Sequence, residues 1–417
     1  MNDLNLKQVN VFHPRTQHSY QLALAVQKAG LLHQFITSIY YKENCFPYNL
    51  IHILPKFLSS KSAKEFRRRF LDGLDTKKVK QYPWFEIARL AIEKVGISQY
   101  LKSQAVYFCD MQIDRYVRDN CLSGINAVAG FSESCVETFR KAEKIGVQCI
   151  MDQTTAYVDF VDKTLKEEME LSPDFAEAIS TPKDKKWLEE RREEARLADA
   201  ILCASEFVKQ SLVENGINGK KIRMIRYGVN TNRFTLKQRK QKEGKEFIVL
   251  FVGSIGPLKG IKYLLEAIKQ LNISEIHLQL IGDFIGSTKP YRSYTGFFEH
   301  RSRVLNVDLP HFYASADLLV LPSLVEGFGL VALEAMASGL PVIVSENTGV
   351  KEIVENSQDG FIVPIRNVEA LKEKILFLYE HKELCQEMGL RARKKAEQFS
   401  WAQYHDNIGQ FFKAFLN

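Results

Sequence analysis

The chain has 417 residues, of which 45% are hydrophobic and 26% are charged, and 57 basic and 50 acidic residues give it a formal net charge of +7. This is an ordinary globular composition, and the length suits two domains rather than one. No run of 18 apolar residues is present, so we expect no transmembrane helix.

The first residues and the cysteines indicate the compartment. The N-terminus lacks the apolar core of a signal peptide and leads straight into a strand pattern, so we expect a cytoplasmic protein. None of the seven cysteines forms a C-x-x-C pair, and their odd number argues against a disulfide framework and against a zinc site. The nine histidines form neither H-x-x-x-H nor H-E-x-x-H, so we expect no metal held by the protein.

The chain opens with an alternation of strand and helix. Residues 8–12 are predicted to form a strand, a polar loop and a helix over 20–29 follow, and a second strand is predicted near 34–39. His18 lies in the loop directly before the helix, where its imidazole is a candidate contact for a donor or an acceptor. The alternative is a histidine that only caps or packs the helix.

Residues 51–104 form a basic segment. It holds 12 Lys or Arg and five Asp or Glu, so its net charge of 12 − 5 = +7 equals the excess of the whole chain. Its basic residues are interleaved with apolar ones such as Phe66, Phe70 and Trp84. Such a mixture favours an anionic membrane surface, and it also suits a phosphate-bearing acceptor or nucleic acid. The alternative is a helical insertion with an apolar core face and a solvated basic face.

Strands and helices alternate again after the basic segment. Strands are predicted over 105–109, 127–131, 148–151, 200–203 and 222–225. Helices are predicted over 135–144, 187–197 and 206–215. Such alternation implies a mostly parallel sheet covered on both faces. Asp152 comes directly after the strand at 148–151, so it is a candidate to face a cleft.

The polar stretch 235–245, TLKQRKQKEGK, has no apolar periodicity and is the best candidate for a linker. The pattern then restarts. Strands are predicted over 247–251, 276–281, 318–321 and 341–344, and helices over 261–271, 330–338, 370–379 and 401–416. The chain is therefore predicted to form two α/β units of comparable size, with ligands at the carboxyl ends of strands and between the domains.

A glycine-rich loop at 253–260 carries Lys259 directly before a predicted helix. A lysine there is a compact positive charge that can neutralise a diphosphate leaving group. The loop matches neither G-x-x-x-x-G-K-[ST] nor G-x-G-x-x-G, so it indicates neither a P-loop nor a dinucleotide site. The alternative for Lys259 is a solvated surface lysine.

The segment 321–344, LPSLVEGFGLVALEAMASGLPVIV, is the most informative part of the chain. Glu326 lies in a turn with Gly327 and Gly329, which allow a ligand to approach the backbone closely, and Glu334 lies on the helix that follows. The start of that helix presents unpaired N–H groups and a partial positive charge, which suit a phosphate. Carboxylates accept hydrogen bonds from sugar hydroxyls. The combination predicts a nucleotide sugar as ligand, and the alternative is a surface turn followed by a solvated glutamate.

The string E-G-F-G-L-x-x-L-E-A-M-A-x-G-x-P-V-I resembles the signature of retaining GT-B glycosyltransferases of family 4, with Glu326 and Glu334 as its E-x7-E pair. The loop with Lys259 resembles that family's V-G-x-L-x-x-x-K-G loop, although Ser254 stands where the family has an arginine. The resemblance covers nearly all of 200–400 through specific motifs. In this part Tyr227 replaces a common asparagine.

The resemblance implies an α/β fold of the GT-B type, in which two Rossmann-like, doubly wound domains face each other across a cleft. It implies an acceptor-binding domain over 1–234, a donor-binding domain over 246–400 and a C-terminal helix over 401–417 that crosses back to the first domain.

The resemblance also implies a retaining glycosyltransferase that uses a nucleoside-diphosphate sugar and needs no metal or other cofactor. Its acceptor would be a saccharide or a lipid-linked molecule, in cell-envelope or exopolysaccharide synthesis. Lys259 and Glu326 would carry the chemistry, Glu326 through the donor sugar and Lys259 through the diphosphate, and Glu334 would contact the ribose. The implied donor-binding residues are Gly253, Ser254, Lys259, Glu326, Gly327, Phe328, Gly329, Leu330 and Glu334. His18 and Asp152 are the candidate residues on the acceptor side.

Two other functions fit parts of the pattern. A sugar-nucleotide epimerase shares the two-domain plan, and a non-catalytic protein could use residues 51–104 to bind a membrane or nucleic acid. We expect a cytoplasmic enzyme, peripheral on the inner face of the membrane if the basic segment binds anionic lipid. We expect no nucleic acid partner.

Overall fold

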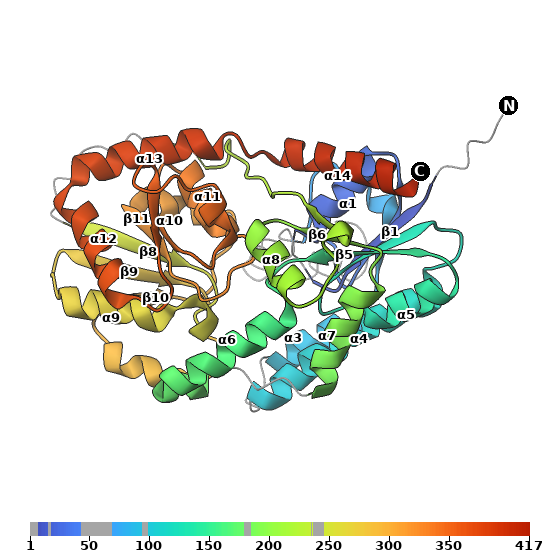
Figure 1. The fold of residues 1–417 in the computed structure, drawn as a ribbon, viewed down its shortest axis with the longest axis horizontal. Helices are drawn as coiled ribbons and strands as arrows, with labels where there is room; N and C mark the ends of the chain where they lie inside the picture. The colour runs from blue at the N-terminus through green and yellow to red at the C-terminus, as the bar shows by residue number, and fades with distance from the viewer. Residues whose placement is uncertain are drawn as a thin grey trace, which may run out of the picture.

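The computed structural model describes residues 7–15, 18–42, 69–93, 99–178, 185–234, 236 and 246–417. Two α/β domains lie side by side, each built around a parallel sheet with helices on both of its faces (Figure 1). This is the arrangement predicted from the sequence, two Rossmann-like domains that face each other, and the prediction is confirmed.

The N-terminal sheet has seven parallel strands in the order β3-β2-β1-β4-β5-β6-β7. The strands are β1 (Val9–His13), β2 (Leu32–Thr37), β3 (Val79–Gln81), β4 (Ala127–Phe131), β5 (Gln148–Gln153), β6 (Ala200–Cys203) and β7 (Ile222–Met224). The helices are α1 (Ser19–Lys28), α3 (Trp84–Glu93), α4 (Gln99–Asn120), α5 (Val136–Lys144), α6 (Val158–Leu171), α7 (Lys185–Leu197) and α8 (Glu206–Glu214). A 3-10 helix, η3 (Pro173–Ala178), follows α6.

The C-terminal sheet has six parallel strands in the order β10-β9-β8-β11-β12-β13. The strands are β8 (Phe247–Val252), β9 (Ile276–Ile281), β10 (Glu299–Arg301), β11 (Leu318–Leu321), β12 (Val342–Ser345) and β13 (Gly360–Val363). The helices are α9 (Ile261–Leu271), α10 (Leu309–Ser315), α11 (Leu330–Ala337), α12 (Val368–Glu380), α13 (Lys382–Ala396) and α14 (Trp401–Leu416). The short 3-10 helices include η5 (Pro257–Lys259), η6 (Lys289–Tyr294) and η7 (Gly349–Glu352).

Both sheets reverse their strand order at one point, between β1 and β4 in the first domain and between β8 and β11 in the second. The loops after these neighbouring strands leave in opposite directions, so a crevice opens at the carboxyl ends of the strands. Since helices cover both faces, strands such as β4 and β11 are buried apolar runs. The strand order therefore defines one candidate site in each domain.

The prediction of a strand over 105–109 is wrong, because these residues lie inside the helix α4. The run of alanine, valine, tyrosine, phenylalanine and cysteine favours a strand by propensity. The residues that follow favour a helix instead. Cys109, Ile113 and Val117 are buried and are spaced four residues apart, so they lie on one face of a helix. The sheet instead contains a strand that the sequence analysis did not predict. This strand is β3, which pairs with β2 at the edge of the sheet and lies within the basic segment.

Much of the basic segment (residues 51–104) lies outside the described residues, namely 51–68 and 94–98. In its described part, Arg69 and Arg89 both pair with the buried Glu86, at 3.1 and 2.7 Å. Burial raises the pKa of Glu86, but the two guanidinium groups outweigh it and hold that pKa below its usual value. These two basic residues therefore stabilise the fold. The predicted linker over 235–245 also lies outside the described residues, except for residue 236.

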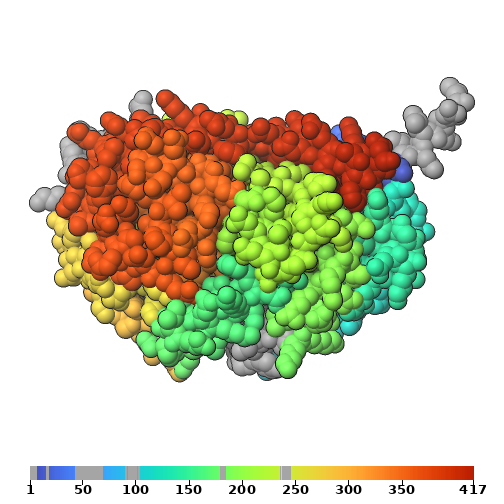
Figure 2. Space-filling view, viewed as in Figure 1, coloured from blue at the N-terminus to red at the C-terminus, as the bar shows by residue number. Residues whose placement is uncertain are grey.

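Helix α14 leaves the C-terminal domain and packs against α1 of the N-terminal domain (Figures 1 and 2). The His405 ring joins the two helices, with Nε2 at 2.8 Å from Oε1 of Gln21 and Nδ1 at 3.0 Å from Nζ of Lys28. Burial, helped by the charge of Lys28, lowers the pKa of His405 to about 4. None of the helices in the described part of the chain is long and apolar enough to span a membrane.

Helix α6 and η3 extend from the N-terminal domain to the C-terminal domain (Figure 1). The carboxylate of Glu168 is the centre of this contact, because it accepts hydrogen bonds from the Tyr263 hydroxyl at 2.9 Å and from Nε of Arg366 at 2.9 Å. Glu168 is only 2% exposed, whereas its neighbour Glu167 is 42% exposed. A buried carboxylate with these partners fastens the two domains together.

Replacing Glu168 with alanine should loosen the two domains. Removing one partner of a buried ion pair leaves the other desolvated and costs about 3 kcal/mol, so we expect a clearly lower Tm in calorimetry. The matched control is Glu167→Ala, because Glu167 contacts the same Arg366 at 3.3 Å from an exposed position and should cost less than about 0.5 kcal/mol. An equal drop in both variants would contradict the role of Glu168.

Candidate active site

A cavity of about 320 Å³ lies between the domains, at the carboxyl ends of the central strands. Its walls come from both domains, which is where ligands of such folds bind. The N-terminal domain contributes His18, Thr154 and Tyr227, and the C-terminal domain contributes Val252, Gly253, Ser254, Lys259, Glu326, Phe328, Gly329, Leu330 and Val331. We refer to this space as the interdomain cavity.

Lys259 and Glu326 form an ion pair within the interdomain cavity. Lys259 ends η5, after β8, and Glu326 follows β11, the neighbouring strand, so the sheet brings the two loops together. Gly260 allows their close approach, because it has a φ of 65° and a Cβ there would lie 2.0 Å from the carbonyl oxygen of Pro322. Both side chains remain reachable, at 23% and 19% exposure. The cavity thus holds a cation and a carboxylate in contact.

The turn after Glu326 leads into helix α11, whose start faces the same cavity. Gly329 adopts a φ of 93° as the residue before the helix, and no side chain caps this end. The first N–H groups of the helix, beginning at Leu330, therefore add a partial positive charge to the cavity wall. Together with Lys259 they place positive charge on this wall of the cavity.

Glu334 lies one turn further along α11 and outside the lining of the interdomain cavity. Its Oε2 accepts a hydrogen bond from the Tyr313 hydroxyl at 2.9 Å. Burial raises the pKa of Glu334 to about 7, although Tyr313 and Arg233 act in the opposite direction. Near neutral pH this carboxyl is therefore only partly ionised.

Gly327 places the glutamate turn directly against the N-terminal domain. The hydroxyl of Ser205 donates a hydrogen bond to the Gly327 carbonyl oxygen at 2.6 Å. A Cβ on Gly327 would lie 2.0 Å from the carbonyl oxygen of Thr154. Only a glycine fits here, so the contact between the domains and the position of Glu326 depend on the same residue.

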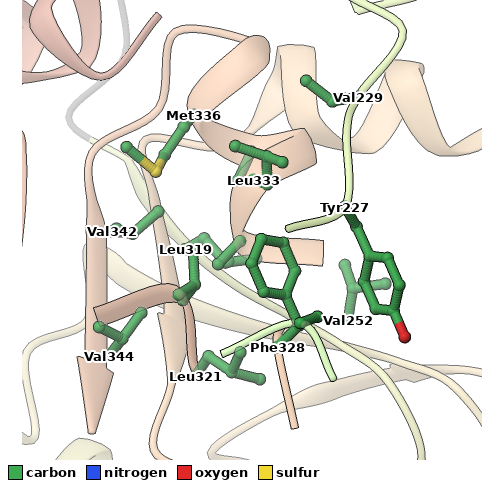
Figure 3. Close-up of a cluster of buried hydrophobic side chains, with 14 of the residues drawn as sticks. Tyr227, Val229, Val252, Leu319, Leu321, Phe328, Leu333, Met336, Val342 and Val344 are labelled. Carbon is green, nitrogen blue, oxygen red and sulfur yellow. The ribbon is translucent and has the colours of Figure 1, made fainter. Parts of the chain in front are cut away.

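Phe328 packs into the apolar core under the cavity rather than standing free in it. Figure 3 shows its ring among Leu319, Leu321 and Leu333, and only 3% of the residue is exposed. Tyr227 meets this ring edge to face at 5.4 Å, with its hydroxyl directed away from the apolar cluster (Figure 3). The core thus holds the turn in place from below.

His18, Asp152 and Tyr227 form a hydrogen-bonded group on the N-terminal wall. Nε2 of His18 lies 2.8 Å from the Tyr227 hydroxyl and 3.2 Å from Oδ2 of Asp152. Burial raises the pKa of Tyr227 well above its usual value, and the charge of Asp152 adds to the effect. His18 and Tyr227 line the cavity, whereas Asp152 lies behind them and orients both.

The structure brings together most of the site residues predicted from the sequence. It leaves Gly327, Glu334 and Asp152 outside the cavity lining, at its edges. The sequence analysis did not place Tyr227 and Thr154 in the site, although Tyr227 stood at a position where the chain departs from the family pattern. Among the described residues there is no group of three or more His, Cys, Asp or Glu able to hold a metal ion.

Residues 232–395 match the family described as Glycosyl transferases group 1. A curated uncharacterized glycosyltransferase of Methanocaldococcus jannaschii is 34% identical to this chain, over 49% of the chain and 56% of the relative. The capsular polysaccharide biosynthesis glycosyltransferase CapM of Staphylococcus aureus is 28% identical, over 52% of the chain and 63% of the relative. The chain thus spans little more than half the length of these relatives.

Solved structures share the whole architecture. HepE of Anabaena in complex with UDP-glucose superimposes with a TM-score of 0.63, covering 98% of this chain and 99% of HepE at 13% identity. Sucrose-phosphate synthase of Thermosynechococcus elongatus gives a TM-score of 0.64 at 18% identity, covering 98% of this chain and 99% of that protein. The fold is therefore GT-B.

Replacing Gly327 with alanine should force the domains apart. The added methyl group meets a backbone carbonyl that cannot rotate away, and overpacking of this kind costs about 1–3 kcal/mol. We expect a larger radius of gyration in small-angle scattering and a lower Tm. Gly219→Ala is the control, because its Cβ would meet only a Val213 methyl group at 3.7 Å. Unchanged scattering for Gly327→Ala would show that the contact is not tight.

Glu334 should make stability fall as pH rises. An unfolded glutamate ionises near pH 4.5, but the folded one does so near 7, so the folded state is penalised progressively between these values. Replacement by glutamine removes the penalty. The Tm of the wild type minus that of Glu334→Gln should therefore be smaller at pH 8 than at pH 4.5. Glu194 and Asp114, whose pKa values are also raised, are present in both proteins and cancel. A difference in Tm that stays constant with pH would contradict the raised pKa.

Proposed function

We propose that this chain, whose residues 232–395 belong to the glycosyl transferases group 1 family, is a retaining glycosyltransferase. It moves a sugar from a nucleoside-diphosphate sugar to a saccharide or lipid-linked acceptor. The observation that carries the proposal is the contact between Lys259 and Glu326 in the interdomain cavity, beside the uncapped start of α11.

When the donor binds, its diphosphate replaces Glu326 as the partner of Lys259. Without ligand, Glu326 neutralises Lys259. A diphosphate carries more charge than one carboxylate and takes over the lysine, with the N–H groups near Gly329 and Leu330 as further donors. Glu326 is then free to accept hydrogen bonds from the hydroxyls of the donor sugar. Since Ser254 replaces an arginine, the helix start carries a larger share of the diphosphate charge.

The reaction breaks the bond between the anomeric carbon and the diphosphate oxygen, and it forms a bond to the acceptor oxygen on the same face. The acceptor proton passes to the departing phosphate, as the family resemblance implies. Negative charge grows on the diphosphate, so Lys259 and α11 accelerate the step by electrostatic stabilisation and by holding the reactants in place. No metal is needed in this scheme, and we assign no side chain as the base.

The N-terminal wall receives the acceptor. His18 and Tyr227 face the donor residues across the cavity, and their mutual hydrogen bond with Asp152 fixes their orientation. The similarity to CapM, which is named for capsular polysaccharide biosynthesis, supports a role in polysaccharide synthesis. We place the enzyme at the cytoplasmic side of a membrane as part of the same proposal. The basic segment would supply the membrane contact. Because Arg69 pairs with Glu86, a test of this contact should change Arg67 and Arg68 and leave Arg69.

A thermal-shift panel with UDP, GDP, ADP, TDP and CMP, with and without EDTA, tests the donor site. A ligand at about 100 times its Kd stabilises the folded state by roughly 2.7 kcal/mol, so one diphosphate should raise Tm by a few degrees in either buffer. Lys259→Ala should abolish the shift, whereas Lys269→Ala, which removes an exposed lysine of α9, should preserve it.

No shift with any nucleotide would overturn the donor site. With the preferred donor in hand, product analysis separates the alternatives. A glycosylated acceptor with the anomeric configuration of the donor supports the proposal, whereas an epimerised free nucleotide sugar supports an epimerase.

A further inference from the structure

A second cavity, of about 240 Å³, lies in the N-terminal domain beneath helices α6 and α7. Most of its wall is apolar. None of the site residues predicted from the sequence lines it. The apolar lining comes from Ala156, Tyr157, Val158, Val161, Leu165, Met169, Trp187, Leu188 and Leu258. We refer to it as the α6–α7 cavity.

The α6–α7 cavity opens at the carboxyl ends of two central strands. Ser132 and Glu133 follow β4, Gln153 ends β5, and residues 155–158 come shortly after it. This is the edge of the sheet at which α/β folds bind ligands. Glu133 has a φ of 77°, a backbone conformation that is costly for a residue with a side chain and that clusters at functional sites.

The α6–α7 cavity and the interdomain cavity share a wall. Leu258 lines the first and Lys259 the second, and likewise Thr155 lines the first and Thr154 the second. Leu258 is held in place because its carbonyl oxygen accepts hydrogen bonds from the N–H groups of Leu324 and Val325, which lead to Glu326. A molecule in the α6–α7 cavity is thus separated from the donor residues by a single layer of residues.

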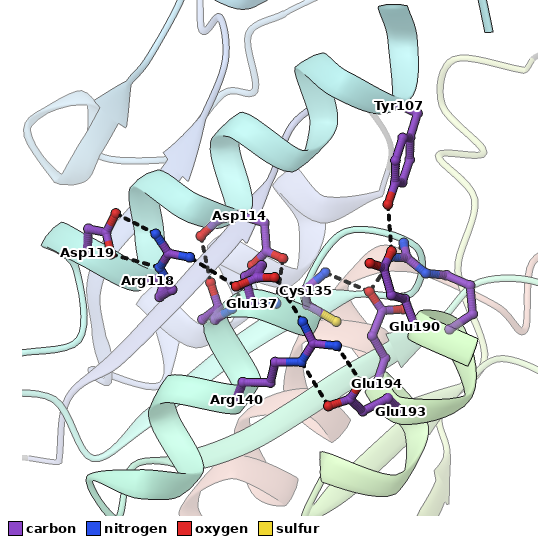
Figure 4. A network of polar contacts seen from close by, with 12 residues as sticks. Tyr107, Asp114, Arg118, Asp119, Cys135, Glu137, Arg140, Glu190, Glu193 and Glu194 are labelled. Carbon is purple, nitrogen blue, oxygen red and sulfur yellow. Dashed lines mark hydrogen bonds and ion pairs between the residues drawn. The ribbon is translucent and has the colours of Figure 1, made fainter. Parts of the chain in front are cut away.

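One charged group in the wall lacks hydrogen-bond acceptors. Arg191 is 3% exposed, and its ion pairs with Glu194 and Glu190, at 3.3 and 3.5 Å, leave all three guanidinium nitrogens without a hydrogen bond. Glu194 is already engaged by the Cys135 N–H at 2.9 Å (Figure 4). Burial raises the pKa of Glu194, although the charge of Arg191 acts in the opposite direction. All three nitrogens are buried, so Arg191 does not present its N–H groups to a ligand in the cavity.

We propose that the α6–α7 cavity binds the apolar group of the glycosyl acceptor, so that the acceptor is an alkyl or aryl glycoside or a lipid rather than a free sugar. The inference rests on the proposed transferase function, since the acceptor must extend past Leu258 and Thr155 for its hydroxyl to reach the donor. An apolar cavity of about 150 Å³ holds benzene. The larger α6–α7 cavity therefore accommodates a phenyl ring or a short alkyl chain.

Binding of glucose, phenyl β-glucoside and a series of n-alkyl β-glucosides tests the proposal, by calorimetry and by the fluorescence of Trp187, which lines the cavity. The shared sugar isolates the effect of the apolar group. Each buried methylene should tighten binding about fourfold until the cavity is full. Val161→Trp fills the cavity and should weaken alkyl glucoside binding at least tenfold, while the shift with nucleotide stays.

Lys163→Trp is the matched control, because it adds the same ring on the exposed face of the same helix and should leave binding intact. If Val161→Trp does not fold, Leu165→Phe makes the same comparison with a smaller group. Equal affinity for glucose and its alkyl derivatives, or binding that Val161→Trp leaves unchanged, would overturn the proposal.

The nucleotide measurement keeps the two proposals apart. If a nucleotide raises Tm but glucoside affinity does not depend on the length of the alkyl chain, only the cavity proposal is overturned. Chain-length-dependent binding that Val161→Trp removes, in a protein that binds no nucleotide, supports the apolar cavity and overturns the transferase.

Discussion

The arrangement of the site depends on close backbone contacts at two glycines. Gly260 lets the loop after β8 press against the carbonyl of Pro322, and Gly327 lets the glutamate turn press against that of Thr154. The first contact brings Lys259 to Glu326, and the second brings Glu326 to the N-terminal domain. A side chain at either position would clash with a backbone oxygen. The close approach of Lys259 and Glu326 therefore requires glycine at both positions.

The two domains are held together by polar groups that surround this point. Glu352 of η7 accepts hydrogen bonds from the N–H groups of Glu206 and Phe207, at the start of α8, and it pairs with Arg226 at 3.2 Å. A carboxylate at a helix N-terminus is favoured by the partial positive charge there. Glu168 of α6 makes a second polar contact between the domains, with Arg366. Interfaces of this polar kind permit domain movement.

Elements with turn signals at both ends were predicted well, whereas an apolar run without such signals was not. The strand at Ala200–Cys203 and the helix at Ile261–Leu271 matched within a residue because turn signals bound them on both sides. The run at 105–109 has strand-like residues but no such boundaries, and the helix around it was missed. The edge strand Val79–Gln81 is three residues long, too short to leave a periodic pattern, and pairing with β2 alone makes it a strand.

The sequence alone determined the two-domain α/β plan and pointed to Lys259, Glu326 and Gly329 of the interdomain cavity, because these residues lie within motifs whose spacing is local. Only the tertiary structure decided what the first domain contributes. His18, Asp152 and Tyr227 are separated by up to 209 positions, and they meet because parallel strands end at one edge. The α6–α7 cavity, likewise, joins strand ends to a leucine of the other domain. Such distant contacts leave no periodic signal along the chain, since packing between elements creates them.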